Sequence, residues 1–416
     1  MCEVNMKNTM AIRVREFDME RDLPAVEDLE RRCQVGLSGD QAGSDEASTV
    51  DADDDGAKRW TRKKKKAKKQ GMSLYVEQIG DPFARVRHSP DYVILVAEHG
   101  EEGGEVVGVI KACVRTVSRG MKKRFAKMGC LLGLRVSPSH RRLGIATELV
   151  RRAEAWCEAR GAAHATMATT ASNSASLALF TGRFGYAPFR RPVFLGQPVH
   201  RHRARVPSAH RVLQLPPPLA VAAYASLLLP AEFVPTDLPT LLAHKLTLGT
   251  YLAVERGADP SLPPSFALLS VWDATRSLRL RVGGAAPLLR ASLAAARALD
   301  RHAPWLHVPS LPDVFRPFGT YLLYGLRMSG PEGPALLRSL CRHAHNVARN
   351  NPACAVVAAD LGPGDPAAAA VPHWPSFSCD EDVWCVKKLG NAAGDDDEDW
   401  TTAPRADILF VDPREF

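Results

Sequence analysis

Residues 133–147 have the sequence GLRVSPSHRRLGIAT, and this stretch decides the fold that we expect for the chain. An apolar segment at 130–136 runs into a basic turn that contains Gly144, and an amphipathic helix is predicted over about 147–160. The first amides of a helix have no partner within it, and the helix dipole places partial positive charge there. A strand, a basic turn with glycine and a helix start, in this order, therefore predict a binding site for a pyrophosphate.

A second motif follows the predicted helix. After another apolar strand, expected at 163–169, residues 173–186 have the sequence NSASLALFTGRFGY. Asn173 is suited to cap a helix, and Gly185 is suited to end it before another strand begins. The two motifs together resemble those of the GNAT N-acetyltransferases, in which Arg141-x-x-Gly144-x-Ala146 would be the acyl-CoA pyrophosphate loop.

This resemblance implies an α/β (α+β) GNAT acyl-CoA N-acyltransferase fold, a mixed sheet with splayed parallel strands, and acetyl-CoA as cosubstrate without a metal. It also implies which residues contact the cosubstrate. The backbone near Leu134 and Val136 would hold the acetyl group, and Asn173 would contact the pantetheine arm. The pyrophosphate would be bound by the turn and the helix start: Arg141, Arg142, Gly144, Ile145, Ala146 and Thr147.

The catalytic groups are less clear from the sequence. Phe180 would also contact the cosubstrate, at a position where many family members have a tyrosine as the general acid. Phenylalanine packs equally well there but cannot donate a proton. No carboxylate lies on the segment 130–136, so Glu98, on a neighbouring expected strand, is our candidate for the general base; a surface charge is the alternative. Two hypotheses stay open: an active acetyltransferase, or a catalytically degenerate CoA-binding scaffold.

A narrower resemblance is carried by FTGRFGY at 180–186, by PVHRHR at 198–203 and by FVDPR at 410–414. These segments are similar to the plant Hookless-type N-acetyltransferases. That family implies a nuclear regulator of differential growth in hormone response, with a protein lysine, such as one of a histone, or a small amine as acceptor. It also implies self-association into a homo-oligomer.

The charge of the chain is concentrated in one run. Residues 58–69 carry nine Lys or Arg and no acid, and removing these nine from the net charge of +8 leaves −1. The run follows an acidic Ser/Gly-rich stretch, and we expect the whole insert at 37–71 to be disordered. A nuclear localisation signal bound by an import receptor is the interpretation that we favour. Non-specific contact with nucleic acid or chromatin is the second interpretation, which we do not favour, and an inert solvated loop is the third.

Other classes of protein are disfavoured. The longest apolar run, 219–229, has eleven residues and is too short to span a bilayer, so we expect no membrane contact. Nine scattered cysteines indicate a reduced protein rather than a disulfide framework. Cys379 and Cys385 with His373 match no common zinc spacing, so we expect no metal site.

The chain is long enough for two domains. We expect the GNAT domain at 10–204, with a short helix at 73–79 and a strand at 186–195, then a Pro-rich linker at 205–218. The sequence GLRMS at 325–329 repeats GLRVS at 133–137, so 219–416 is predicted to be a second, degenerate GNAT-like domain. Its loop at 329–334, SGPEGP, has no arginine and two prolines that lack amide donors, so we expect no CoA binding there.

Overall fold

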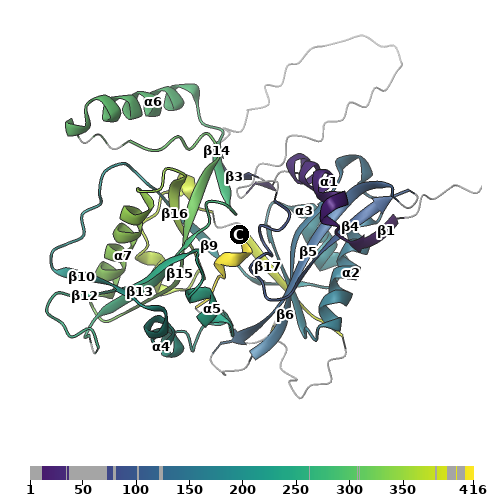
Figure 1. The fold of residues 1–416 in the computed structure, drawn as a ribbon, viewed down its shortest axis with the longest axis horizontal. Helices are drawn as coiled ribbons and strands as arrows, with labels where there is room; N and C mark the ends of the chain where they lie inside the picture. The colour runs from purple at the N-terminus through teal and green to yellow at the C-terminus, as the bar shows by residue number, and fades with distance from the viewer. Residues whose placement is uncertain are drawn as a thin grey trace, which may run out of the picture.

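The computed structural model describes residues 12–33, 35–36, 73–77, 81–100, 103–120, 125–261, 263–306, 308, 310–379, 382–390, 400 and 408–416. The insert expected at 37–71, with the basic run, lies outside the described residues. The described residues form two halves, each built on a mixed sheet, and the C-terminal segment lies between them (Figure 1).

In the described residues the first sheet has eight strands, and its order is β1 (Ile12–Glu16), β4 (Tyr92–His99), β5 (Glu105–Arg119), β6 (Phe125–Val136), β7 (His164–Thr170), β17 (Asp382–Lys388) and β8 (Ala187–Arg190), with β11 (Glu232–Pro235) beside β5. Among the described strands of this sheet, only β6 and β7 pair in parallel. Their connection, α2 (Ile145–Ala159), covers one face, and α1 (Met19–Arg32) covers the other. The strand β4 alternates accordingly, because Val93 and Leu95 pack on the α2 side while Ile94 and Val96 pack on the α1 side.

The second sheet has nine strands in the described residues: β10 (His210–Leu215), β12 (Thr247–Glu255), β13 (Phe266–Asp273), β15 (Phe318–Ser329), β14 (Arg279–Gly283), β3 (Ser73–Glu77) and β2 (Val35–Gly36), with β16 (Cys354–Leu361) and β9 (Val193–Pro198) joined through β15. The long helix α7 (Gly333–Ala348) contributes to the core on one face. The helices α4 (Pro217–Leu227) and α5 (Leu238–Leu242) contribute to the core on the other. The helix α6 (Pro287–His302) stands apart from both layers (Figure 1). No helix of the described part is both long and apolar enough to span a membrane.

The two halves repeat one arrangement. In each, a long strand leads through a helix to a parallel partner, β6–α2–β7 in the first and β15–α7–β16 in the second. Each long strand also has a bulge at its Gly-Leu-Arg sequence, where Gly133 has φ +60° and Gly325 has φ +64°. Glycine adopts this left-handed conformation without the steric cost of a Cβ. The predicted repeat of GLRVS in GLRMS is thus confirmed as a repeat of structure.

The observed strands correct three expectations, two of them because the halves exchange strands. Residues 73–79 were expected as a helix, but β3 is a strand of the second sheet, where Leu74 is buried and Val76 packs on the same core. The single strand expected at 186–195 is divided at Pro192 into β8 and β9, because proline cannot donate to the ladder and the chain changes sheets there. The expected linker at 205–218 contains β10, which pairs with β12.

The exchange is reciprocal. From the expected first domain, β9 pairs with β16 of the second sheet, and from the expected second domain, β17 pairs with β7 of the first. The sequence boundary that we expected near 205–218 therefore does not coincide with the boundary between the sheets. As a consequence, residues near the C-terminus lie beside the parallel strands of the first half.

Candidate active site

The parallel strands β6 and β7 separate after a short paired segment. They pair only from Met128 with His164 to Leu131 with Met167, so residues 132–136 and 168–170 diverge. A cavity of about 420 Å³ lies at this gap. The splayed parallel strands that we expected are therefore present, and the backbone of β6 lines the cavity from Leu131 to Val136.

The basic turn borders one end of this cavity. Gly144, at φ +85°, is the N-cap residue of α2, and among the described residues no side chain caps the helix start. Arg142 also has a positive φ, of +66°, which residues other than glycine rarely adopt. Left-handed residues in a turn direct neighbouring amides to one side and create a concave site for an anion. The local backbone therefore suits the pyrophosphate predicted from the sequence.

The structure brings most of the predicted cosubstrate-binding residues together. Six of them line the cavity: Leu134, Val136, Arg141, Ala146, Asn173 and Phe180. The other four, Arg142, Gly144, Ile145 and Thr147, belong to the adjoining turn and helix start. The side chains of Ile145 and Thr147 are buried, so these two residues can offer only their backbone amides to a ligand.

The segment after β7 shapes the opposite wall. The Asn173 Oδ1 accepts a hydrogen bond from the amide of Ser176 at 3.2 Å, which confirms its predicted role as a helix cap. The helix expected at 174–184 consists of α3 (Ser174–Leu177) followed by a π-helical turn over Ala178–Arg183. Such turns are frequent at functional sites. Phe180 in this turn is 2 % exposed and packs edge-on against the ring of Tyr186.

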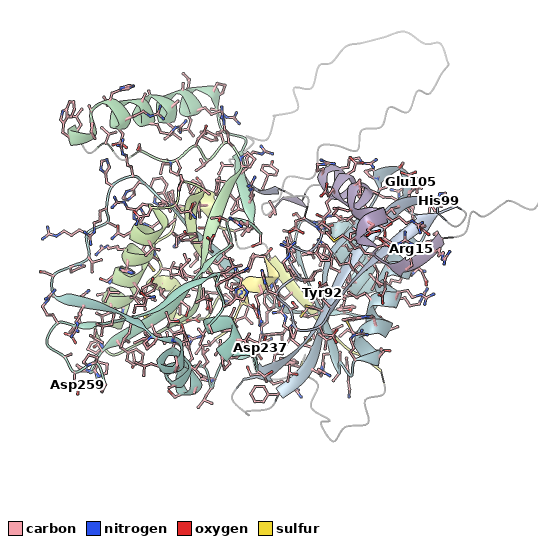
Figure 2. The ribbon with its side chains drawn as sticks, viewed as in Figure 1. Arg15, Tyr92, His99, Glu105, Asp237 and Asp259 are labelled. Atoms are coloured by element: carbon pink, nitrogen blue, oxygen red, sulfur yellow. The ribbon has the colours of Figure 1, made fainter. Side chains whose placement is uncertain are left out.

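The position of Glu98 does not support its nomination as general base. Glu98 is buried but does not line the cavity. Its Oε1 accepts a hydrogen bond from the Arg15 Nε at 3.0 Å and is also paired with Arg21. Arg15 lies at the outer edge of the first half (Figure 2). The carboxylate thus holds β1 and α1 to β4, because two guanidinium groups compensate its burial.

Three carboxylates that the sequence analysis missed line the same cavity: Asp360 from β16, Asp382 from β17 and Glu415 from the C-terminal segment. Glu415 forms an ion pair of 3.0 Å with Arg115. Burial raises the pKa of Glu415 to about 7, against the opposing effect of Arg115. Burial, together with the nearby Asp382 and Glu415, raises the pKa of Asp360 well above its usual range. No local motif marks these residues, because only the tertiary structure brings them together here.

Arg85 and Arg135 also line the cavity. The Arg135 Nη1 donates to the backbone oxygen of Leu134 at 2.9 Å, and burial and the neighbouring Arg85 lower the pKa of Arg135 to about 10. The cavity therefore has both basic and acidic parts. Across the described ranges, no group of three His, Cys, Asp or Glu side chains is arranged to hold a metal ion.

Comparison with known proteins agrees with this geometry. The model of the acetyltransferase (GNAT) family matches residues 59–186. The chain is 68% identical to the acetyl transferase GW6a of Oryza sativa subsp. japonica, and the match covers all of both chains. It is 40% identical to the probable N-acetyltransferase HLS1 of Arabidopsis thaliana, over 97% of this chain and 99% of HLS1.

Among solved structures, N-myristoyltransferase of Saccharomyces cerevisiae with bound myristoyl-CoA has a similar fold. The TM-score is 0.51 at 10% sequence identity, and the match covers 91% of this chain and 79% of that enzyme. A GCN5-related glucosamine N-acetyltransferase region of a fungal β-N-acetylglucosaminidase matches with a TM-score of 0.50, at 14% identity, over 90% of this chain and 38% of that chain.

Proposed function

The chain belongs to the acetyltransferase (GNAT) family, in the group that includes GW6a and HLS1, and we propose that it transfers an acetyl group from acetyl-CoA directly to the nitrogen of an amine. One observation carries the proposal. Six residues that the two motifs single out converge on one cavity at the separation of β6 and β7, beside a helix start that no side chain of the described residues caps. Acetyl-CoA, when bound, supplies the activated thioester.

The residues of the chain have three tasks in this reaction. The turn at Arg141 and Gly144, with the first amides of α2, binds the pyrophosphate. The backbone of β6 near Leu134 and Val136 orients the acetyl group and polarises its carbonyl. A base must take a proton from the attacking nitrogen, and the position of Glu98 excludes it from direct contact with a ligand in this cavity.

A CoA-binding scaffold without turnover is the second candidate, and Phe180 is the observation that favours it. Phe180 lines the cavity but has no hydroxyl group to protonate the leaving thiolate. The two candidates share the same cosubstrate site and differ only in the chemistry that follows binding.

The assay for the proposed function is an incubation of the full chain with acetyl-CoA and a panel of amines. The panel contains histone-tail peptides, a peptide with a free N-terminus, spermidine and glucosamine. We expect release of CoA and a product heavier by one acetyl group with at least one acceptor. Binding of acetyl-CoA without any acetylated product would favour the scaffold. Absence of binding would refute both candidates.

We further propose a nuclear location and a role in hormone-controlled differential growth, with a protein lysine, such as one of a histone, as acceptor. The basic run at 58–69 and the Hookless-type resemblance support this proposal. It includes an import receptor that binds the basic run, and it includes self-association of the chain. Changing Lys63, Lys64, Lys65 and Lys66 to alanine should move a fluorescent fusion out of the nucleus. An unchanged nuclear signal would refute the assignment of the run.

A further inference from the structure

The cavity has an acidic part that comes from outside the region matched by the GNAT family model. Asp360, Asp382 and Glu415 all follow residue 186, where that match ends. We propose that this part binds the acceptor as a primary ammonium ion and that Glu415 accepts the proton that the nitrogen loses. The inference rests on the proposed function, since a bound amine becomes an acceptor only where an acyl group is transferred.

Asp360 carries the first step of the argument. Asp360 is one of the residues that line the cavity although it is only 8 % exposed, and its buried Oδ1 has no hydrogen-bond partner among the described residues. A buried carboxylate oxygen without a donor is energetically costly. With Asp382 and Glu415 as neighbours, the group that relieves this cost is a cationic donor. An ammonium ion offers three N–H groups and one positive charge.

Glu415 carries the second step. Its carboxylate is anchored by Arg115, and the side chain is 25% exposed. Arg115 also forms an ion pair of 2.6 Å with Asp412, so Arg115 is not neutralised by Glu415 alone. Burial raises the pKa of Glu415 to about 7, which is the range in which a general base both accepts and releases a proton near neutral pH.

The charged and titratable groups that influence Glu415 come from several elements. They are Arg115 and Cys113 on β5, Cys130 on β6, Asp360 on β16, Arg85, and Asp412 and Arg414 of the C-terminal segment. Arg115 favours the ionised form of Glu415, while burial and the neighbouring acids oppose it.

The remaining lining indicates what kind of amine fits. Phe194, Trp384 and Phe416 line the cavity and offer apolar surface to a carbon chain. The occupant is therefore a primary ammonium on an aliphatic stem, as in a lysine side chain or an alkylamine. The arginines Arg85 and Arg135 line the same cavity, so a second cationic group next to the first would be disfavoured.

The proposed step is balanced without another reactant. The ammonium ion loses one proton to solvent, and the resulting amine nitrogen attacks the thioester carbonyl carbon. A C–N bond forms, the C–S bond breaks, and the second proton passes from nitrogen to Glu415. Transfer of that proton to the CoA thiolate, directly or through water, regenerates the carboxylate. The products are an acetamide and CoA with a free thiol.

Binding is tested with n-butylammonium chloride and the neutral analogue n-butanol. Saturation-transfer NMR with the full chain and saturating CoA gives both dissociation constants. We expect butylammonium to bind at least about tenfold more tightly than butanol, and Asp360→Asn to abolish this preference, because a charged hydrogen bond is lost. Asp259→Asn, an exposed acid at the far end of the second half, should change neither constant (Figure 2). Equal binding of the two probes, or an unchanged preference in Asp360→Asn, would overturn the ammonium site.

The base is tested with Glu415→Gln and Glu415→Asp. We expect Glu415→Gln to lower kcat by about 10²-fold or more, with unchanged affinity for acetyl-CoA, and a cooperative thermal unfolding transition verifies that the variant is folded. The rise of kcat/KM with pH near 7 should disappear in Glu415→Gln and persist, at a lower rate, in Glu415→Asp. Near-normal kcat with an unchanged pH profile would overturn the assignment, as would absence of transfer by the wild type. Failure of acetyl-CoA to bind would instead refute the proposed function, while the butylammonium titration would still decide the ammonium site.

Discussion

Replacing Gly144 with aspartate should selectively weaken the binding of acetyl-CoA. Gly144 is the N-cap residue of α2 at φ +85°, and a Cβ at this position would meet no atom within 4 Å. Asparagine and aspartate tolerate the left-handed conformation better than other residues with a side chain. The structure therefore predicts that both Gly144→Asn and Gly144→Asp fold, and that the two variants differ only in charge.

The magnitude follows from Coulomb's law. At a separation of about 5 Å, the repulsion between the aspartate and one phosphate charge is about 0.8 kcal/mol in water and about 3 kcal/mol at an effective dielectric constant near 20. Gly144 is exposed, so the lower value is the appropriate one. Two phosphate charges then cost about 1.7 kcal/mol, which corresponds to a roughly fifteenfold weaker affinity.

Calorimetric titration of acetyl-CoA into the wild type and both variants measures this effect. We expect Gly144→Asp to bind at least about tenfold more weakly than Gly144→Asn, and Gly144→Asn to remain within about threefold of the wild type. Thermal unfolding of all three proteins verifies that they are folded. Equal affinity of the aspartate and asparagine variants would refute the placement of the pyrophosphate at this turn.

Three further predictions concern stability. Arg190 and Glu232 form a buried ion pair with contacts of 2.6 and 2.7 Å, so Glu232→Gln should lower the free energy of unfolding by about 3–5 kcal/mol in a denaturant titration. The control is Asp91→Asn at the exposed pair with Arg160, which should lower the free energy of unfolding by less than about 1 kcal/mol. Equal losses in the two variants would contradict the argument from burial. Burial raises the pKa of Glu415 from 4.5 to about 7. Protonation of Glu415 therefore stabilises the folded state fully below about pH 4.5, and this contribution to the free energy of unfolding is lost as the pH rises through about 7. Glu415→Gln should flatten the pH dependence of the free energy of unfolding in this interval, and an unchanged slope would count against the raised pKa. Phe180→Ala should destabilise the chain by about 3–5 kcal/mol, because the ring is 2 % exposed in the core, whereas a loss below 1 kcal/mol would show that the ring is loosely packed.

The first half was largely predictable because its signals are local. The Gly144 turn and the Asn173 cap each depend on a few adjacent residues, and each was expected close to its observed position. The repeated Gly-Leu-Arg also pointed to the second half, because in both copies the glycine occupies the same left-handed bulge.

The strand exchange was not predictable in the same way. Residues 73–77 have apolar side chains at Leu74 and Val76, but their partner β14 lies about 200 residues away, so no local pattern identifies the pairing. The same holds for Glu415 and Asp360, which reach the cavity only through tertiary structure. Glu98 was nominated because it lies on a strand neighbouring the site, and burial beside Arg15 and Arg21 became evident only with the structure.

The most direct test of the account is hydrogen–deuterium exchange of the full chain with and without CoA. CoA should slow exchange in the two segments that line the cavity, 131–147 and 167–180, and leave the corresponding bulge and helix of the second half, 325–348, unchanged. Protection at 325–348, or no protection at 131–147, would contradict the conclusion that the first half alone holds the cosubstrate.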